Sequence, residues 1–305
     1  MNDMAHEAIY PGGSGDEPSG GEPPDDTLTD TRVRDTLQLL LHSPSFVAGA
    51  LILVWWIVCA LAGAWFAPHD AYASDPLSSL MPPDRTHWCG TDQLGRDICS
   101  RVIVGARDIL TIAPLATLVG TLAGAALGLV TGYSEGAFGT LVARTLDAVL
   151  ALPLVIVALL VLAAVGASNL AVVLVIGITF APLVARTVRA AVLAERHLDY
   201  VAAARLRGAS ALAVMFTEIL PNVWPPIVVE ATVRLGYAIF AVATLSFLGF
   251  GIQPPSADWG LALAESYTLL AGGAWWTVAF DALAIASLVV AVNLIADSLR
   301  EVLVS

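Results

Sequence analysis

Long uncharged stretches alternate with polar segments along most of this chain. Residues 148–185 and 235–257 contain no charged side chain, and between them lies a polar segment, residues 186–225, which we call the polar island. About 20 apolar residues are enough for a helix to cross the hydrocarbon core of a bilayer. The pattern predicts a polytopic membrane protein that holds a structured, charged segment on one face.

The apolar stretches predict six membrane-spanning helices. They cover residues 46–67, 109–133, 146–165, 170–186, 226–250 and 276–298. The run 148–185 is too long for one crossing, and the Gly-Ala-Ser-Asn sequence at 166–169 is expected to form a turn within it. Runs such as 155–165 lack the polar–apolar alternation of a barrel strand, so an all-α protein is predicted.

Composition supports a membrane protein and narrows its chemistry. Of the 305 residues, 57% are hydrophobic and 13% are charged, whereas soluble domains have about 25% charged residues. All 14 cationic side chains are arginine. The absence of lysine excludes a Walker A phosphate loop and a Schiff-base nucleophile. We expect no catalytic site and no bound cofactor in this chain, and an ATPase that drives it must be another protein.

The charge distribution divides the chain into three regions. Residues 1–30 contain eight acids and no arginine, so a disordered acidic tail is predicted for residues 1–35. Residues 36–108 would hold the first span and a long outer loop, and residues 109–305 the other five spans with the polar island. Nine arginines lie on the side of the termini and four in the loop 68–108, which predicts that both termini are cytoplasmic.

The loop of residues 68–108 contains two of the three cysteines. Cys89 and Cys99 can form a disulfide if the loop faces an oxidising compartment, with free thiols as the alternative. Cys59 lies within an apolar span and is expected to be a core residue. Part of the loop is expected to form an amphipathic surface helix with three charged residues on one face: Asp97, Arg101 and Asp108. No spacing of His and Cys is typical of a zinc site, so no metal site is predicted.

Glycine recurs at every fourth position of the second span. Such a line lets another backbone approach closely, so it predicts tight helix packing, with a moving gate helix as the alternative. Its members are Gly120, Gly124, Gly128 and Gly132. Three prolines inside or near the ends of spans predict bends of the helix axis: Pro114, Pro153 and Pro182.

Three charged side chains within spans are candidate pathway residues. Glu230 and Arg234 are four positions apart, in the order that favours an ion pair on a helix. They either neutralise each other near the membrane surface or line an inner vestibule. Asp281 lies about one turn into the sixth span, where it either faces a wet cavity or reaches back to the outer surface.

The polar island predicts two short helices joined at a glycine. The alanine-rich residues 199–207 favour a helix, and Gly208 can take the left-handed conformation that ends it. Ser210 can cap a second helix, and Pro221 is expected to stop that helix. A membrane protein that builds such a hairpin on one face is expected to bind a partner with it.

The polar island resembles the cytoplasmic loop of permease subunits of bacterial ATP-binding cassette (ABC) importers. The signature of that loop is Glu-Ala-Ala, three residues, Gly, nine residues, Ile, one residue, Leu-Pro. Five residues match it: Ala203, Ala204, Gly208, Leu220 and Pro221. Ala202 stands in place of the Glu and Glu218 in place of the Ile, so no role of the family's acid is carried over to residue 202.

Further segments resemble the C-type permease of dipeptide, oligopeptide and nickel importers. They include Gly-Thr-Asp-Gln-Leu-Gly-Arg-Asp at 90–97 and Leu-Ser-Phe-Leu-Gly-Phe-Gly-Ile at 245–252. Shorter matches, in the same order as in the family, occur at residues 100–101, 105–107, 254–255, 258–260 and 293–300. The likeness covers about residues 40–302. Where the family often has Pro-Gly near the start of the last span, this chain has Phe280 and Asp281.

The resemblance implies a six-helix permease of the type I importer fold in the bacterial inner membrane. It implies a B-type permease that completes the translocation path, two ATPase subunits that use ATP, and an external binding protein; nucleic acid is not an expected partner. The polar island would be the coupling loop, whose short helix at about 201–212 docks into an ATPase groove. The residues expected to take part are Asp199, Tyr200, Ala203, Ala204, Arg205, Gly208, Ala209, Leu220 and Pro221.

The implied function is ATP-driven import of di- or oligopeptides, and two kinds of alternative stay open. The same architecture can carry nickel or another small solute, because the binding protein selects much of the cargo. An ion-coupled secondary transporter would use Glu230, Asp281 or Asp147 as proton sites, although such folds often show inverted repeats and none is clear here. A membrane scaffold or receptor without transport is the remaining class.

Overall fold

The computed structural model describes residues 38–134 and 137–304. The predicted acidic tail, residues 1–35, lies outside the described residues. Within them the regular structure is helical, apart from one bridge pair between Thr91 and Asp97. The prediction of an all-α membrane protein is confirmed.

Five helices in the described part of the chain are long and apolar enough to cross a membrane. They are α2 (Pro44–Phe66), α3 (Ile98–Tyr133), α6 (Asn169–Glu195), α9 (Leu220–Phe247) with the turns leading into it, and α11 (Trp276–Val304). The shorter helices α4 (Ala137–Leu150) and α5 (Leu154–Val165) are long and apolar enough only when they are taken together. Counted as one bent span, they bring the candidate spans to six.

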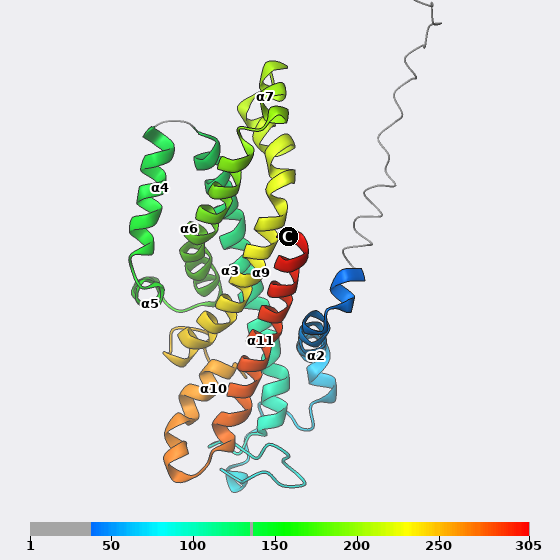
Figure 1. Cartoon of the computed structure of the whole chain (residues 1–305). Coiled ribbons are helices and arrows are strands. Elements are labelled where there is room, and N and C mark those ends of the chain that lie inside the picture. Colours follow the sequence, from blue (N-terminus) through cyan, green and yellow to red (C-terminus); the bar gives the residue numbers. More distant parts are fainter. Residues whose placement is uncertain (1–37, 135–136, 305) are drawn as a thin grey trace, which may run out of the picture.

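The remaining elements are short, and all but α8 and η2, which lead into α9, lie between the candidate spans. They are the 3-10 helices η1 (Pro76–Ser78) and η3 (Tyr267–Gly272), the α-helices α7 (Asp199–Leu206), α8 (Ala211–Ala213) and α10 (Trp259–Ser266), and the π-helix η2 (Val214–Ile219). In Figure 1, α7 stands at one end of an elongated molecule, and α10 lies toward the other end with the loop that precedes α3. We call these the α7 end and the α10 end.

The glycine line of α3 lies against α6. A Cβ atom added to Gly124 would lie 2.5 Å from Cβ of Val184 and 2.7 Å from the carbonyl oxygen of Ala181. Cβ atoms essentially never approach other atoms so closely, and Gly120, Gly128 and Gly132 meet α6 at similar distances. The two helices therefore pack at a separation that only glycine permits on this face of α3.

The main core lies where α2, α3, α5, α6, α9, α10 and α11 meet. Trp259, the largest fully buried side chain, donates its indole N–H to the Val102 carbonyl at 2.9 Å. Its ring packs edge-on against Trp56, with 4.8 Å between ring centroids, and Trp56 donates to Ser287 Oγ at 2.9 Å. Each buried indole thus has a hydrogen-bond acceptor, which removes the cost of burying its N–H.

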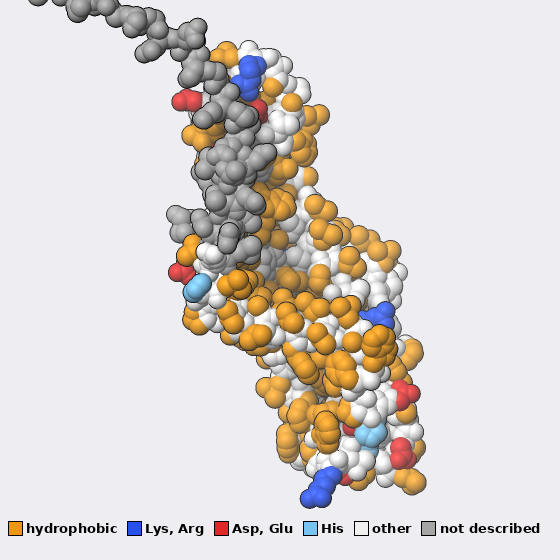
Figure 2. Space-filling view, turned by 90° about the vertical axis from the view of Figure 1, so that its right-hand side faces the viewer, with side chains coloured by type: hydrophobic (Ala, Val, Ile, Leu, Met, Phe, Trp, Pro, Cys, Tyr) orange, Lys and Arg blue, Asp and Glu red, His pale blue; other side chains and the backbone are white. Residues whose placement is uncertain are grey.

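Hydrophobic side chains cover most of the middle of the face in Figure 2, and charged and histidine side chains gather at its lower end. Large apolar residues are exposed on α2 and α5, among them Leu61 (82%) and Leu160 (67%). Such exposure would be costly in water and is the expected surface of a helix that faces lipid.

The predicted amphipathic surface helix in the loop 68–108 is wrong. Residues 98–108 are the first turns of α3, which begins where the Asp97 carboxylate accepts a hydrogen bond from the Ser100 N–H at 2.8 Å. Arg101 is only 3% exposed, and its guanidinium donates to the carbonyls of Ala71 (3.4 Å) and Ser256 (3.1 Å). These acceptors let the helix carry a cation into the protein, which the sequence pattern did not reveal.

The third predicted span is not one continuous helix. Its residues form α4 and α5, whose axes differ by 86°. Pro153 occupies the N-cap position of α5 in an extended conformation. Because proline lacks an N–H and disfavours a helical conformation of the residue before it, α4 ends at Leu150.

Pro221 does not stop the second helix of the polar island, contrary to prediction. The chain continues from α8 through the π-helix η2 into α9 as one helix, Ala211–Phe247. Pro221 lies in the first turn of α9. The N–H of Leu220 bonds to the Met215 carbonyl five residues back, so the turn before the proline is wider than an α-turn and leaves room for its ring.

Candidate functional site

The polar island extends one candidate span and then forms a hairpin. Residues 186–195 continue α6 beyond the predicted end of the fourth span, and residues 196–220 contain α7, the turn at Gly208, α8 and η2. We call residues 196–220 the hairpin. It stands at the α7 end, beyond the ends of the neighbouring helices (Figure 1).

A second cluster of buried apolar side chains holds the hairpin to the helix ends. Val201 and Ala204 of α7 are fully buried, as are Val214 and Ile219 of η2. They pack with apolar residues of α6 and α9 such as Val192. The small side chain at position 204 lets α7 approach η2 closely, so the hairpin is fixed to both neighbouring spans.

Polar contacts along α7 and at Arg196, which precedes it, add to this attachment. The Tyr200 hydroxyl donates to a carboxylate oxygen of Glu195 at 2.6 Å. Burial, together with the Glu195 carboxylate, raises the pKa of Tyr200 to about 12, so its hydroxyl keeps the proton that it donates. Arg196 donates to the Gly132 carbonyl at 3.1 Å, and the Arg205 guanidinium lies 4.9 Å from the centre of the Tyr133 ring. The hydrogen bond of Arg196 and the contact between Arg205 and the Tyr133 ring both join the hairpin to the end of α3.

The turn of the hairpin is a Schellman motif. Gly208 has a φ of +81°, its N–H bonds to the Arg205 carbonyl at 3.0 Å, and the Ala209 N–H bonds to the Ala204 carbonyl at 3.2 Å. Ser210 then caps α8 by accepting the Ala213 N–H at 3.2 Å. This is the arrangement that the positions of Gly208 and Ser210 predict.

The tip of the hairpin presents exposed apolar side chains at the α7 end. Leu206 is 89% exposed and Leu212 is 64% exposed. The Arg207 side chain beside them is 65% exposed and forms an ion pair with Glu218 at 3.4 Å. Sequence reasoning missed both leucines as site residues, although large apolar residues that flank a capping glycine between two polar helices were a usable signal. Exposed leucines held on a rigid turn are typical of a docking surface.

The nine predicted coupling residues do not form one surface. Arg205, Gly208 and Ala209 lie at the exposed tip, whereas Ala204 is fully buried beneath it. Asp199 and Tyr200 lie in the first turn of α7, and Ala203 is half-buried on the same helix. Leu220 and Pro221 lie at the base, where α9 begins, and Leu220 packs on the second cluster.

The charged pathway candidates lie in two places. Arg234 donates from Nε to Glu230 at 2.7 Å and stacks 5.2 Å from the Tyr237 ring, so the pair is formed on α9. Asp281 is only 3% exposed and does not reach the outer surface. Within the described residues its Oδ1 atom has no hydrogen-bond partner, and the positive charge of Arg101 acts on it electrostatically.

An apolar groove runs between α3 and the helix formed by η2 and α9. It encloses about 500 Å³, and its lining side chains include Leu118, Leu122, Phe216 and Trp224. These four residues are all more than half exposed. The groove is open along its side and presents a long apolar surface.

The α10 end is held together by covalent and charged links. Cys89 and Cys99 are joined by a disulfide. Arg96 pairs with Asp92 and, at 3.0 Å, with Glu265 in α10. Together these contacts fix the long loop against α3 and α10.

Asp258 begins α10 and is fully buried at the same end. Its carboxylate accepts the Leu261 N–H at 2.8 Å, which caps the helix. Burial raises the pKa of Asp258 to about 6, because removal from water disfavours the charged carboxylate more than this hydrogen bond favours it.

Two family models together match most of the chain, with residues 84–123 between them. The family model described as the binding-protein-dependent transport system inner membrane component matches residues 124–305. The model of the N-terminal transmembrane domain of oligopeptide transport permease C matches residues 31–83.

Relatives of similar length support the same assignment. The chain is 37% identical over 277 residues to the di/tripeptide transport system permease protein DppC of Pseudomonas aeruginosa, covering 89% of this chain and 91% of the relative. It is 35% identical to the probable D,D-dipeptide transport system permease protein DdpC of Escherichia coli, covering 87% and 89%. It is 32% identical to DppC of Bacillus subtilis, covering 88% and 84%.

A solved structure shares the fold. The inward-facing MetNI methionine ABC transporter matches with a TM-score of 0.55 and 18% identity, over 66% of this chain and 96% of that one. At this identity the likeness concerns the arrangement of the helices alone.

Proposed function

The chain belongs to the inner-membrane permease components of ABC importers, and on this premise we propose that it forms half of a translocation path for peptides. Its membership also makes it a multi-pass protein of the inner membrane. The proposal assigns the other half of the path to a B-type permease, the energy to two ATPase subunits and the delivery of cargo to an external binding protein.

The hairpin is the observation that carries this proposal. It combines a capped turn, two exposed leucines at its tip and a buried base that is packed on the ends of α3, α6 and α9. A surface that binds a separate motor must be exposed and also stiff, and the hairpin is both. Because the chain contains no lysine, the proposal assigns the Walker A phosphate loop to another protein.

Movement of the hairpin would pass directly to the spans. On one side of the hairpin, only three residues separate the end of α6 from the start of α7. On the other side, the chain continues without a break in the helix Ala211–Phe247. When ATP closes the two ATPase subunits, the docked hairpins would approach each other and tilt these helices as rigid bodies. The path would thereby alternate between its inward-open and outward-open states.

The hairpin also sets the proposed orientation. An ATPase acts in the cytosol, so the α7 end is cytoplasmic and the α10 end with its disulfide faces outward. Six crossings then put both termini in the cytoplasm, in agreement with the excess of arginine on that side. Residues 36–108 remain the proposed first region and residues 109–305 the proposed permease core.

The names of the relatives support peptides as the cargo. Two of the three are dipeptide permeases by name and the third is a di/tripeptide permease. Nickel or another small solute on the same architecture is the alternative for cargo. An ion-coupled mechanism has no support in the family, and Glu230, its first candidate proton site, is already paired with Arg234.

Uptake by a deletion strain tests the proposal. A strain that lacks this chain is complemented with the wild-type sequence and supplied with labelled dipeptides, longer peptides and Ni²⁺. We expect peptide uptake to return only when the partner ATPase has an intact Walker A lysine. Uptake that persists with an inactive ATPase, or solute movement by the purified chain alone, would overturn the proposed function. Selective return of Ni²⁺ uptake would overturn the peptide cargo and leave the coupling intact.

A further inference from the structure

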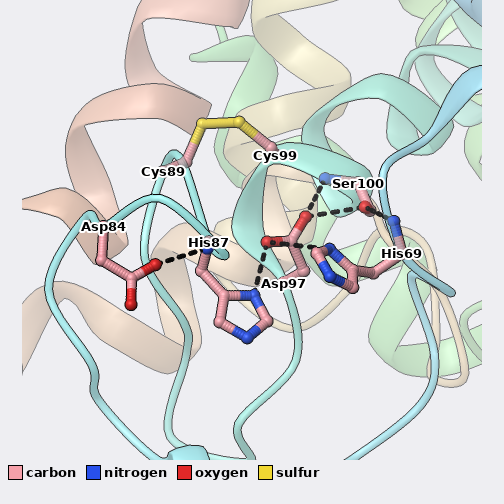
Figure 3. The surroundings of a disulfide bond; sticks show 7 residues. All are labelled: His69, Asp84, His87, Cys89, Asp97, Cys99 and Ser100. Carbon is pink, nitrogen blue, oxygen red and sulfur yellow. Dashed lines mark hydrogen bonds and ion pairs between the residues drawn. A yellow bond between two sulfur atoms is a disulfide. The ribbon is translucent and has the colours of Figure 1, made fainter.

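Three potential metal ligands meet at the α10 end. His69 follows α2, His87 lies in the long loop, and Asp97 precedes α3. Nδ1 of His87 lies 2.9 Å from Oδ1 of Asp97, and Nδ1 of His69 lies 3.7 Å from the same oxygen. Figure 3 shows both imidazole rings turned toward this carboxylate. The two ring centroids are 4.7 Å apart.

The two oxygens of Asp97 have different partners. Oδ2 accepts the N–H of Ser100 at 2.8 Å and its hydroxyl at 2.7 Å, and thereby caps α3. Oδ1 faces the two histidines. The nearby arginines are engaged elsewhere, because Arg96 and Arg101 pair with Asp92. Among the described residues, the ionisable side chains that face Oδ1 of Asp97 are those of His69 and His87.

The backbone holds these ligands in place before any ion binds. His87 stands two residues before Cys89 and Asp97 two residues before Cys99, so the disulfide between the cysteines ties the two ligand segments together. Asp84 accepts the backbone N–H of His87, and the Asp84 N–H donates to the His87 carbonyl at 2.9 Å. The backbone N–H of His69 donates to Ser100 Oγ at 2.9 Å, which links the third ligand to the cap.

We propose that His69, His87 and Asp97 bind a divalent transition-metal ion, for which Zn²⁺ is the fitting probe. Ligand atoms of a tetrahedral zinc site lie about 3.3–3.5 Å apart, since each is about 2.0–2.1 Å from the metal. The two measured distances to Oδ1 bracket that value. A purely structural role for Asp97, as the cap of α3, would account for a hydrogen bond with one histidine, His87. It does not account for the second imidazole, that of His69, which faces the same oxygen from beyond hydrogen-bond distance.

The remaining coordination position would be open to water. His69 has a side chain that is 38% exposed, and a hollow of about 500 Å³ lies beside it. Asp97 and its Ser100 contacts supply the outer hydrogen bonds that usually orient a metal-binding carboxylate. The bound ion would link the segment after α2 to the start of α3. Spacing rules missed this site because its ligands come from separate, irregular stretches of the loop.

Metal binding to the intact chain tests the proposal. The full chain is purified with its partner permease, without a histidine tag and without reductant, is stripped with a chelator and is then dialysed against Zn²⁺ or Co²⁺. We expect one ion per chain by elemental analysis, and a visible Co²⁺ spectrum typical of nitrogen and oxygen ligands. Loss of an outer-shell partner commonly weakens metal binding about 10–100-fold, so His69→Gln and His87→Gln should weaken Zn²⁺ binding at least tenfold.

Asp97→Asn provides a variant that separates binding from folding. Asparagine caps a helix as well as aspartate does but is a poor zinc ligand, so this variant should keep the folded state and lose the ion. His42→Gln and His197→Gln, at histidines outside the cluster, should bind as the wild type does. The proposal fails if the wild type retains no ion after dialysis, or if the three cluster variants bind Zn²⁺ as tightly as the two controls. These readouts do not depend on transport, so they are independent of the cargo.

Discussion

Gly124 and Ala204 allow close helix packing because one has no side chain and the other has a small one. At Gly124 the missing Cβ leaves space for Val184 of α6, and at Ala204 a single methyl group lets α7 lie on η2. At Gly124 the nearest atoms are Cβ of Val184 and the Ala181 carbonyl oxygen rather than the flexible end of a long side chain, and Ala204 is fully buried. A larger residue at either place must therefore move a whole helix.

Gly124→Leu should destabilise the protein by displacing α6. Forcing extra atoms into a packed contact costs about 1–3 kcal/mol, and here the obstacle includes the Ala181 carbonyl. We expect a lower melting temperature in detergent and less protein in the membrane. Ala164→Leu adds similar bulk to an exposed position of α5 and should leave both unchanged. Normal melting of the Gly124 variant would show that α3 and α6 do not pack as described.

Asp258 should make stability fall as the pH rises. Its pKa is about 6 in the folded state and about 3.9 when unfolded. Between these values the folded state holds the extra proton, so stability is greatest below about pH 4 and is lost progressively up to about pH 6, by roughly 3 kcal/mol at most. Asp258→Asn keeps the cap and removes the titration. Melting temperatures of the variant should therefore rise relative to wild type between pH 4 and 7, and parallel curves would contradict the shift.

The helices on either side of the hairpin would transmit its movement to the spans because they are continuous with it. α6 is itself a candidate span and ends at Glu195, and the π-helix η2 continues directly into α9. Between them, Gly208 is the residue that sets the direction of the chain. Apart from its two chain neighbours, no described residue has an atom within 4 Å of a Cβ added there, so its importance is conformational rather than steric.

Gly208→Val should uncouple transport without preventing assembly. A left-handed conformation costs a residue with a side chain about 1–2 kcal/mol, and a β-branched residue adopts it least readily. The turn would change direction and misplace Leu206 and Leu212. We expect peptide uptake to fall at least about tenfold, the factor given by 1.4 kcal/mol. Gly208→Asn, which tolerates the same φ, should transport nearly as well as wild type, while the complex stays in the membrane in both variants. Equal uptake by the two variants would refute this role.

Local signals in the sequence were enough to locate most elements. Gly208 and Ser210 marked the turn of the hairpin, and the glycine line marked the contact of α3. What the sequence did not reveal depends on partners far along the chain. Arg101 is buried because the carbonyls of Ala71 and Ser256 accept its hydrogen bonds. No local sequence pattern around Arg101 indicates these two acceptors.

The same limit applies to the breaks in helices. Pro153 and Pro221 carry the same local signal, yet one separates α4 from α5 and the other lies within a continuous helix. The difference comes from the wide turn that ends with the bond from Leu220 to Met215. A proline in a sequence therefore indicates strain in the helix, and the surrounding packing decides how the strain is relieved.

At the scale of the whole molecule, the two ends differ in their accessible residues, which allows the orientation to be measured. Leu206 lies at the α7 end and Leu77 in the loop at the α10 end, and they are 89% and 95% exposed. Cys59 is buried and the other two cysteines are bonded, so the native chain offers no reactive thiol among the described residues. With a membrane-impermeant maleimide, Leu77→Cys should react in intact cells whose outer membrane is opened. Leu206→Cys should react only after the inner membrane is broken. The opposite pattern would overturn the cytoplasmic position of the hairpin.

We expect the second permease to pack in the apolar groove between α3 and α9. Leu122, which is 62% exposed, lies in its wall, so it would contact that permease. Leu122→Arg should therefore abolish co-purification of that permease. Leu160→Arg in α5 is the matched control, since Leu160 is 67% exposed and an arginine inside a membrane costs roughly 2.5–3.5 kcal/mol at either helix centre. If lipid fills the groove, the two variants should behave alike. If a permease fills it, only Leu122→Arg should separate the subunits, and uptake should stop in that variant while the control still transports.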